Sequence, residues 1–124
     1  MLDPHSLVTG LEQVTREDFS WGTLQWLCNA RLMPGAAQTF GVCTIQPGGG
    51  NPLHFHPNCE ELLYVAQGSC RHSIEGEWLE LRQGMMIRVP TGVRHNLVNT
   101  GTEPLVCIIS FSSGDRQTVF LEEK

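Results

Sequence analysis

Glycine and proline interrupt this sequence at short intervals, and this spacing constrains the fold more than any other feature. The chain has 13 glycines and 7 prolines in 124 residues. Between them lie runs of about five to eight residues rich in Val, Ile, Leu, Thr and aromatic side chains, a pattern typical of short strands. Many short strands indicate an all-β sandwich or barrel. We predict strands near residues 24–29, 39–46, 53–56, 62–67, 70–74, 78–81, 85–89, 95–99, 105–111 and 117–120.

Turn signals and chain length indicate one barrel domain. Segments 47–50 (Pro-Gly-Gly-Gly), 75–76 (Glu-Gly) and 99–101 (Asn-Thr-Gly) each carry residues that favour reversal of the chain. A chain of this length suits a single domain, which we place at residues 21–124. Residues 1–20 form an N-terminal extension. Its segment 7–17 has mixed polarity, so a helical turn and a strand on the outside of the barrel both remain open.

Composition excludes several classes of protein. The net charge is −5 and the only lysine is Lys124, so no basic patch is expected to bind nucleic acid. No stretch approaches the roughly 18 apolar residues of a membrane helix, and no basic, apolar leader is visible, which favours the cytoplasm. The five cysteines are odd in number and form no Cys-x-x-Cys pair, so we expect reduced thiols, with Cys43 and Cys107 in the core.

Three histidines and a glutamate form the strongest candidate site. His54 and His56 are two residues apart, so on a strand they point to the same face. Glu61 follows on the next strand, and His95 comes directly after a Pro-x-Gly turn. Three imidazoles and one carboxylate suit Mn, Fe, Co, Ni, Cu or Zn better than Ca or Mg, which prefer oxygen ligands. The ligand set does not select among these metals.

The spacing around these four residues resembles the two sequence motifs of the cupins. The first motif, G-x5-H-x-H-x4-E-x6-G, is met by Gly48, His54, His56, Glu61 and Gly68. The second motif, G-x5-P-x-G-x2-H-x3-N, is met by Gly84, Pro90, Gly92, His95 and Asn99. The two motifs together cover residues 48–99, the middle of the chain.

The resemblance implies a fold and a cofactor. The fold would be a double-stranded β-helix, or jelly-roll barrel. Its mouth would hold one divalent transition metal (Mn, Fe, Ni or Zn), and coordination positions would stay open for water or substrate. The implied ligands are His54, His56, Glu61 and His95. Spacing to Gly68 selects Glu61 over Glu60, and alternation along the strand then turns Glu60 outward.

Other polar residues receive weaker assignments. Arg31 and Gln38 are the candidates for substrate binding, with Arg31 preferred because a guanidinium binds a carboxylate through two hydrogen bonds. Alternation turns Arg88 and Arg94 away from the ligands. His72 lies on the hairpin between the motifs, and we predict that it is a surface residue.

Two classes of function remain open. The first is a metal-dependent enzyme of the dioxygenase, decarboxylase, isomerase or lyase type, acting on a small carboxylate or sugar-like molecule. The second is a non-catalytic module that binds a small ligand or a structural metal. A second inward acid or base beside the metal would favour the enzyme, but Tyr64 alternates away from Glu61. By analogy with small cupins, Leu24 and Trp26 are expected on an apolar face buried in a homodimer.

Overall fold

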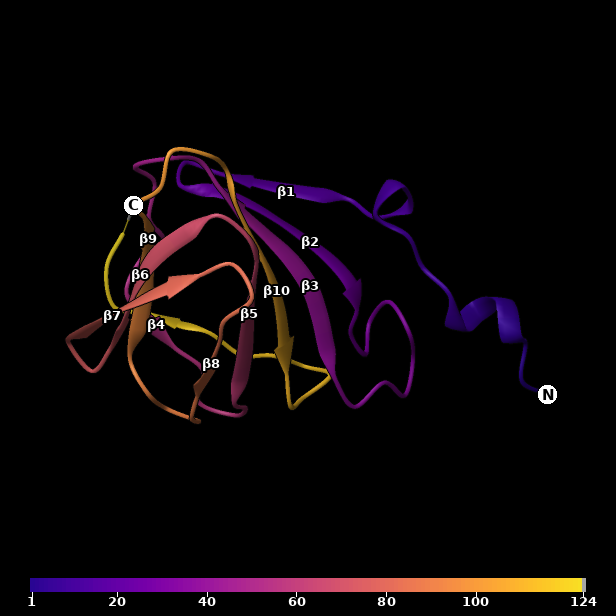
Figure 1. Ribbon diagram of the computed structural model, residues 1–124. Coiled ribbons are helices and arrows are strands. Elements are labelled where there is room, and N and C mark those ends of the chain that lie inside the picture. Colours follow the sequence, from indigo (N-terminus) through magenta and orange to yellow (C-terminus); the bar gives the residue numbers. More distant parts are fainter. Residues whose placement is uncertain (124) are drawn as a thin grey trace.

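Two antiparallel sheets enclose a barrel in the computed structural model, which describes residues 1–123 (Figure 1). The larger sheet has the strand order β1-β2-β3-β10-β5-β8, and the smaller has the order β11-β4-β9-β6-β7. The strands are β1 (Arg16–Phe19), β2 (Gly22–Cys28), β3 (Thr39–Ile45), β4 (His54–Phe55), β5 (Glu61–Gln67), β6 (Ser69–Ile74), β7 (Glu77–Arg82), β8 (Met86–Val89), β9 (His95–Asn99), β10 (Leu105–Phe111) and β11 (Val119–Phe120). Neighbours such as β3 and β10 are far apart in sequence, as in a jelly roll.

The predicted all-β barrel is confirmed, and each of the ten predicted strands is present within two residues of its expected ends. The strand β1 was not singled out by the sequence. All four of its residues are exposed, so it lacks the buried alternation that marks the other strands, and its pairing with β2 holds it in place. Two short 3-10 turns precede it, η1 (Pro4–Leu7) and η2 (Leu11–Gln13). Lys124, the last residue of the predicted domain, lies outside the described residues.

Alternate residues of the central strands fill the barrel. In β10 the buried residues are every second one, and the register places Cys107 between Cys43 of β3 and Val65 of β5. The predicted core position of Cys43 and Cys107 is confirmed, since both are free and buried. Burial raises the pKa of the Cys43 thiol to about 12, so this thiol stays protonated and unreactive.

Trp26 points into the barrel, which corrects its expected place on a dimer face. The register sets Trp26 of β2 opposite Gly41 of β3, and a Cβ atom on Gly41 would lie 2.6 Å from the Trp26 ring. The indole therefore packs over a residue that has no side chain. Trp26 and Leu24 are each only 9% exposed, so neither can form an apolar surface for a second subunit.

Asn99 ties together the chain segments at one end of the barrel. Its side-chain Nδ2 donates to the backbone oxygens of Ile45 at 2.8 Å and Glu103 at 2.9 Å, while its Oδ1 accepts from the Gly101 amide at 2.9 Å. Asn99 is 1% exposed and Ile45 is fully buried, so the bond to Ile45 satisfies a buried backbone oxygen that water cannot reach.

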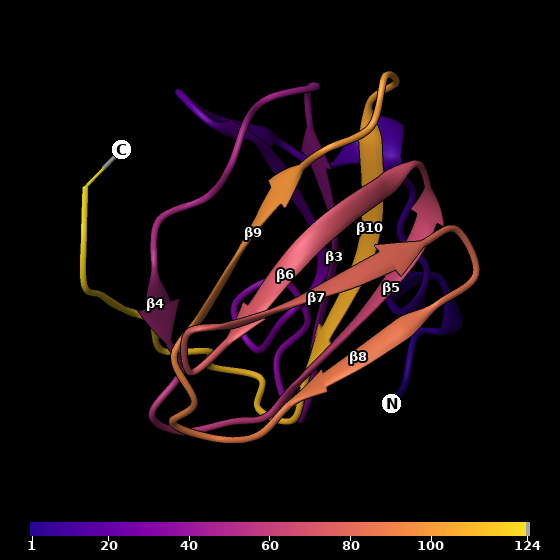
Figure 2. The same cartoon turned by 60° about the vertical axis from the view of Figure 1, so that its left-hand side comes forward.

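The C-terminal segment closes the structure by returning to the start of the metal motif. We call residues 112–120, which follow β10 and end with β11, the C-terminal strap. Figure 2 shows it in yellow, running across the barrel to β4. The Asn58 side chain anchors the strap, donating to the Asp115 oxygen at 2.8 Å and accepting from the Gln117 amide at 3.0 Å. No helix within residues 1–123 is long and apolar enough to span a membrane.

Candidate metal centre and cavity

Four buried side chains converge inside the barrel from three segments of the chain. His54 lies on β4 with His56 directly after it, while Glu61 and His95 are the first residues of β5 and β9. One donor atom from each side chain can be chosen so that all four lie within 4.8 Å of one another. The structure therefore brings together the four residues that the sequence singled out as ligands.

Strand register and one tight turn position these side chains. β4 pairs with β9 so that His54 lies opposite His95. Just before His95, Gly92 has a φ of +80°, a backbone conformation that glycine adopts without strain. The Gly92 amide donates to the backbone oxygen of His56 at 2.9 Å, so the turn that aims His95 also fixes the chain at His56.

Backbone oxygens set the tautomer of all three imidazoles. Nδ1 of His54 lies 2.7 Å from the Pro52 oxygen, Nδ1 of His56 lies 2.9 Å from the Gln117 oxygen, and Nδ1 of His95 lies 2.9 Å from the Val93 oxygen. A carbonyl oxygen can only accept a hydrogen bond, so each ring carries its proton on Nδ1. In the neutral ring each Nε2 then has a free lone pair, as metal-binding imidazoles do.

Glu61 faces these lone pairs. Its Oε1 lies 3.1 Å from Nε2 of His95 and 3.3 Å from Nε2 of His56. Burial by itself raises the pKa of Glu61, whereas a hydrogen bond or positive charge at His56 and His95 lowers it below its ordinary value. With both Nε2 atoms unprotonated, a bound cation would supply that positive charge and keep the side chain a carboxylate. Burial also lowers the pKa of His54 to about 3, with a further contribution from His95, so this imidazole is neutral near pH 7.

The residues present fit a transition-metal ion. A carboxylate oxygen and an Nε2 atom without a proton are both acceptors, so at 3.1 and 3.3 Å their lone pairs face one another unless a cation lies between them. Nε2 of His56 is fully buried and has no hydrogen-bond partner, which is costly for a polar atom. Three nitrogens and one oxygen are the donor set that Mn, Fe, Ni and Zn accept.

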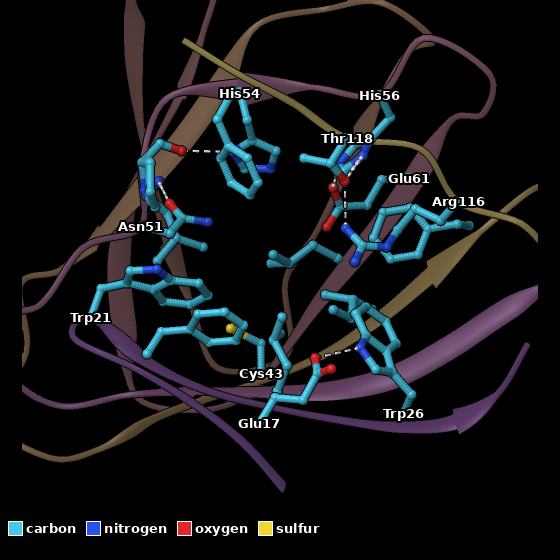
Figure 3. Close-up of a pocket in the computed structure, with 18 of the residues that line it drawn as sticks. Glu17, Trp21, Trp26, Cys43, Asn51, His54, His56, Glu61, Arg116 and Thr118 are labelled. Atoms are coloured by element: carbon cyan, nitrogen blue, oxygen red, sulfur yellow. Dashed lines mark hydrogen bonds and ion pairs between the residues drawn. The ribbon is translucent and has the colours of Figure 1, made fainter. Parts of the chain in front are cut away.

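A cavity of about 680 Å³ opens onto this group (Figure 3). Such a volume is ordinary for a small-molecule site. Apolar and aromatic side chains make up most of its wall, and the charged residues on it are glutamates and one arginine. The lining residues are Glu17, Phe19, Trp21, Leu24, Trp26, Cys43, Asn51, Pro52, His54, His56, Glu61, Leu63, Leu97, Ile109, Phe111, Arg116, Thr118, Phe120, Glu122 and Glu123.

The arginine at the cavity is Arg116, not the Arg31 that the sequence favoured. Arg31 and Gln38 are exposed in the segment between β2 and β3, and neither lines the cavity. Arg116 lies on the C-terminal strap, where its Nη1 donates to the Thr118 hydroxyl at 2.8 Å. The strap has little regular structure, so strand alternation could not indicate where Arg116 points. Its neighbours Asp115 and Gln117 are anchored by Asn58, a contact between residues nearly sixty positions apart.

The neighbours of the ligands take the orientations that alternation predicts. Glu60 points outward, where its Oε1 accepts from Nε of Arg88 at 2.7 Å on the surface. Arg94 pairs with Glu75, also on the surface. Tyr64 is 42% exposed and faces away from Glu61.

The prediction of a surface position for His72 is wrong. His72 lies on β6, between β9 and β7, with 1% of its surface exposed. Its ring stacks on that of His95, with an interplanar angle of 6° and centroids 5.7 Å apart. Burial lowers the pKa of His72 to about 4, so the ring is neutral near pH 7. Its strand is central in the smaller sheet, so one face of it must point inward, and alternation with Cys70 places His72 on that face.

Comparison with known proteins identifies the central part of the chain. The family model of the cupin domain matches residues 41–111, which include all four metal-site residues. The chain is 34% identical over 82 residues to "Polyketide synthase CurC" of Streptomyces cyaneus, a match that covers 66% of this chain and 53% of that protein. It is 34% identical over 113 residues to germin-like protein 3-8 of Oryza sativa subsp. japonica, covering 84% and 50%. The chain thus spans about half the length of the curated relatives it matches.

Solved structures show the same fold. The formate complex of oxalate decarboxylase from Lactobacillus farciminis has a TM-score of 0.82 at 23% identity, covering 89% of this chain and 34% of that one. Oxalate decarboxylase of Bacillus subtilis, described with Mn(II) centres, has a TM-score of 0.80 at 24% identity, covering 90% and 31%. A recombinant oxalate oxidase in complex with glycolate has a TM-score of 0.81 at 22% identity, covering 94% and 64%.

Proposed function

This chain belongs to the cupin family, and from that premise we propose that it is a metal-dependent enzyme acting on a small polar organic molecule, carboxylate or sugar-like. One divalent transition metal would be held by His54, His56, Glu61 and His95. The observation that carries the proposal is the convergence of buried acceptor atoms, without a donor between them, at the wall of a cavity large enough for a small molecule.

Manganese or iron is the metal we favour, with nickel and zinc as alternatives. The donor set accepts all four metals. Manganese is supported by the likeness in fold to Bacillus subtilis oxalate decarboxylase, which is described with Mn(II) centres. A metal bound here would polarise a substrate oxygen as a Lewis acid, and manganese or iron would add redox chemistry. The named relatives differ in substrate, as polyketide synthase and oxalate enzymes do, so they support a cofactor class more than a substrate.

The chain's own residues determine what reaches the metal group. Five aromatic side chains line the cavity and make much of its wall apolar, and electrostatic interactions are stronger beside an apolar wall than in water. Glu17 accepts a hydrogen bond from the Trp26 indole at 3.1 Å, which fixes both side chains on one side of the cavity (Figure 3). The Thr118 hydroxyl lies 3.2 Å from Nδ1 of His56 and links this ligand to Arg116.

One observation favours the alternative, a module that binds a ligand without converting it. Among the described residues, the cavity is lined by no lysine, tyrosine or aspartate, so glutamates are the acidic groups on its wall that could transfer a proton. Besides Glu61 these are Glu17, Glu122 and Glu123. Turnover decides between the two functions. Metal-loaded protein should convert at least one member of a panel of carboxylates and sugars, as followed by mass spectrometry.

The metal is tested first. Protein prepared without a polyhistidine tag is expected to contain about one equivalent of Mn, Fe, Ni or Zn by elemental mass spectrometry. The His54→Ala/His56→Ala variant should lose it, because two of four ligands are gone. The matched control is His5→Ala, which removes an exposed histidine far from the site in sequence. Absence of metal from the reconstituted wild type, or its retention in the double variant, would contradict the proposal.

A further inference from the structure

We propose that Arg116 is a substrate-binding residue and that the substrate is an aromatic monocarboxylic acid, whose carboxylate binds Arg116 and whose ring packs against the aromatic wall of the cavity. This inference rests on the proposed function, since it names the substrate class of the same cavity. Apart from Phe111, the residues it concerns lie outside the part matched by the cupin family model.

Arg116 is a confined cation that forms no ion pair with a carboxylate among residues 1–123. Its guanidinium carbon lies 4.5 Å from the centre of the Trp26 ring and 5.2 Å from that of Phe111, so the two rings enclose it. Among residues 1–123, no carboxylate lies within ion-pair distance of Arg116, and its one hydrogen bond to the protein goes to Thr118. Most of its five N–H donors therefore have no protein acceptor.

Such an arrangement favours a carboxylate ligand. Burial lowers the pKa of Arg116, which means that holding the positive charge here costs free energy. An anion in the cavity would offset that cost, and the planar guanidinium can bind both oxygens of one carboxylate. The aromatic rings and Thr118 hold the side chain in place, so little conformational entropy would be lost when an anion binds.

The rest of the cavity is suited to an aromatic ring. Phe19 and Trp21 stack with their centroids 4.9 Å apart and an interplanar angle of 10°, and together they form a flat apolar wall. Trp26 and Phe111 form a second aromatic surface at Arg116, with their rings edge to face at 6.0 Å. A small aliphatic acid would leave most of the 680 Å³ filled with water, whereas a planar ring system would bury apolar surface against these walls.

The charges around Arg116 favour a single carboxylate on the substrate. Glu61 and Glu17 are the carboxylates that act electrostatically on Arg116, and Glu17 is held on the cavity wall by the Trp26 indole. A second negative charge on the substrate would be repelled by Glu17. The flanking segments thus provide substrate recognition: Phe19, Trp21, Trp26, Arg116 and Thr118 all lie outside residues 41–111, whereas the metal ligands lie within them.

Direct binding to metal-free protein tests the inference without activity as the readout. Isothermal titration calorimetry would compare 2-naphthoate, its neutral analogue 2-naphthalenemethanol, and acetate. Wild type should bind 2-naphthoate at least about tenfold more tightly than either of the other probes. In Arg116→Met the affinity for 2-naphthoate should fall roughly 10- to 100-fold, the range for loss of a charged hydrogen-bonding partner, while the affinity for the neutral analogue changes little.

Two further variants make the result specific. Arg31→Met removes an exposed arginine outside the cavity and should leave all affinities unchanged. Arg116→Lys keeps the positive charge but lacks the planar guanidinium that can donate two parallel hydrogen bonds, so it should retain part of the preference for the carboxylate. This variant keeps the test valid if Arg116→Met does not fold. Equal affinity of wild type for 2-naphthoate and its neutral analogue would overturn the role of Arg116. So would an undiminished carboxylate preference in both Arg116 variants, while acetate binding as tightly as 2-naphthoate would overturn the aromatic assignment.

The two proposals can fail separately. Metal content tests the proposed function, whereas the carboxylate preference is measured after the metal has been removed. Wild type that binds no metal but prefers 2-naphthoate would refute the metal-dependent enzyme and support this inference. Wild type that holds one equivalent of metal but shows no preference would do the reverse.

Discussion

Replacing Glu61 with glutamine should have opposite effects on the metal-free and metal-loaded protein. In the metal-free protein, Oε1 of Glu61 faces the lone pairs of His95 and His56 at 3.1 and 3.3 Å. An amide nitrogen at the same position can donate to both. The variant Glu61→Gln should therefore be more stable than metal-free wild type by about 0.5–1.5 kcal/mol per hydrogen bond gained.

The size of the two effects can be estimated in degrees. For a chain of 124 residues, 1 kcal/mol corresponds to about 4 °C in Tm. Metal-free Glu61→Gln should then melt about 2–6 °C above metal-free wild type for one hydrogen bond gained. Metal at a thousandfold excess over its Kd should stabilise wild type by about 4 kcal/mol, or roughly 16 °C. Loss of the anionic ligand should remove most of that second shift from the variant.

Thermal unfolding followed by circular dichroism, before and after addition of manganese, would measure both effects. The control is Glu60→Gln, which changes the neighbouring exposed carboxylate. It removes only a surface ion pair with Arg88, worth under about 1 kcal/mol, and should keep the full metal shift. If metal-free Glu61→Gln is instead several degrees less stable than wild type, the imidazoles carry protons on Nε2 and form ion pairs with Glu61. The argument from converging acceptors would then be refuted.

Three further predictions concern stability and thiol reactivity. Metal-free protein should lose stability as the pH falls from about 6.5 to 4, because burial lowers the pKa of His72 and the unfolded chain takes up its proton first. In urea unfolding at several pH values, His72→Leu should reduce this slope by up to about 1.4 kcal/mol per pH unit, and an unchanged slope would contradict the assignment. Asn99→Ala should lower the free energy of unfolding by roughly 2 kcal/mol, because the buried oxygen of Ile45 loses its donor and the part-buried bond to Glu103 is also lost; a loss under about 1 kcal/mol would show that the Ile45 oxygen finds another partner. Ellman's reagent should react rapidly only with Cys28 in the native protein, since the other four cysteines are buried, and fast reaction of a second thiol would contradict that burial.

The strands and the metal group could be predicted because their signals are local. Alternation with period two fixes which face of a strand a residue occupies, so the inward Glu61 and the outward Glu60 follow from their positions alone. The turn at Gly92 depends on a backbone conformation that the residue type itself indicates. These features need no knowledge of distant parts of the chain.

The features that sequence reasoning missed depend on contacts between distant segments. The strand β1 carries charged, exposed residues, and only the free edge of β2 makes it a strand. Trp26 turns inward because Gly41 on the next strand leaves room for its ring. Arg116 reaches the cavity because Asn58 anchors the strap. A local pattern cannot indicate which of several loop arginines such anchoring will select, and this is why Arg31 was preferred.

If the two proposals hold, the C-terminal strap couples metal retention to ligand recognition. The Gln117 oxygen holds the His56 ring, and the adjacent residues Arg116 and Thr118 face the cavity. A ligand that shifts the strap would also shift the His56 ring, which the Gln117 oxygen orients. By linkage, the factor by which that ligand changes the affinity for metal equals the factor by which metal changes the affinity for the ligand. Substitutions made in the strap to change which compounds the cavity accepts would then also change how tightly a metal is held.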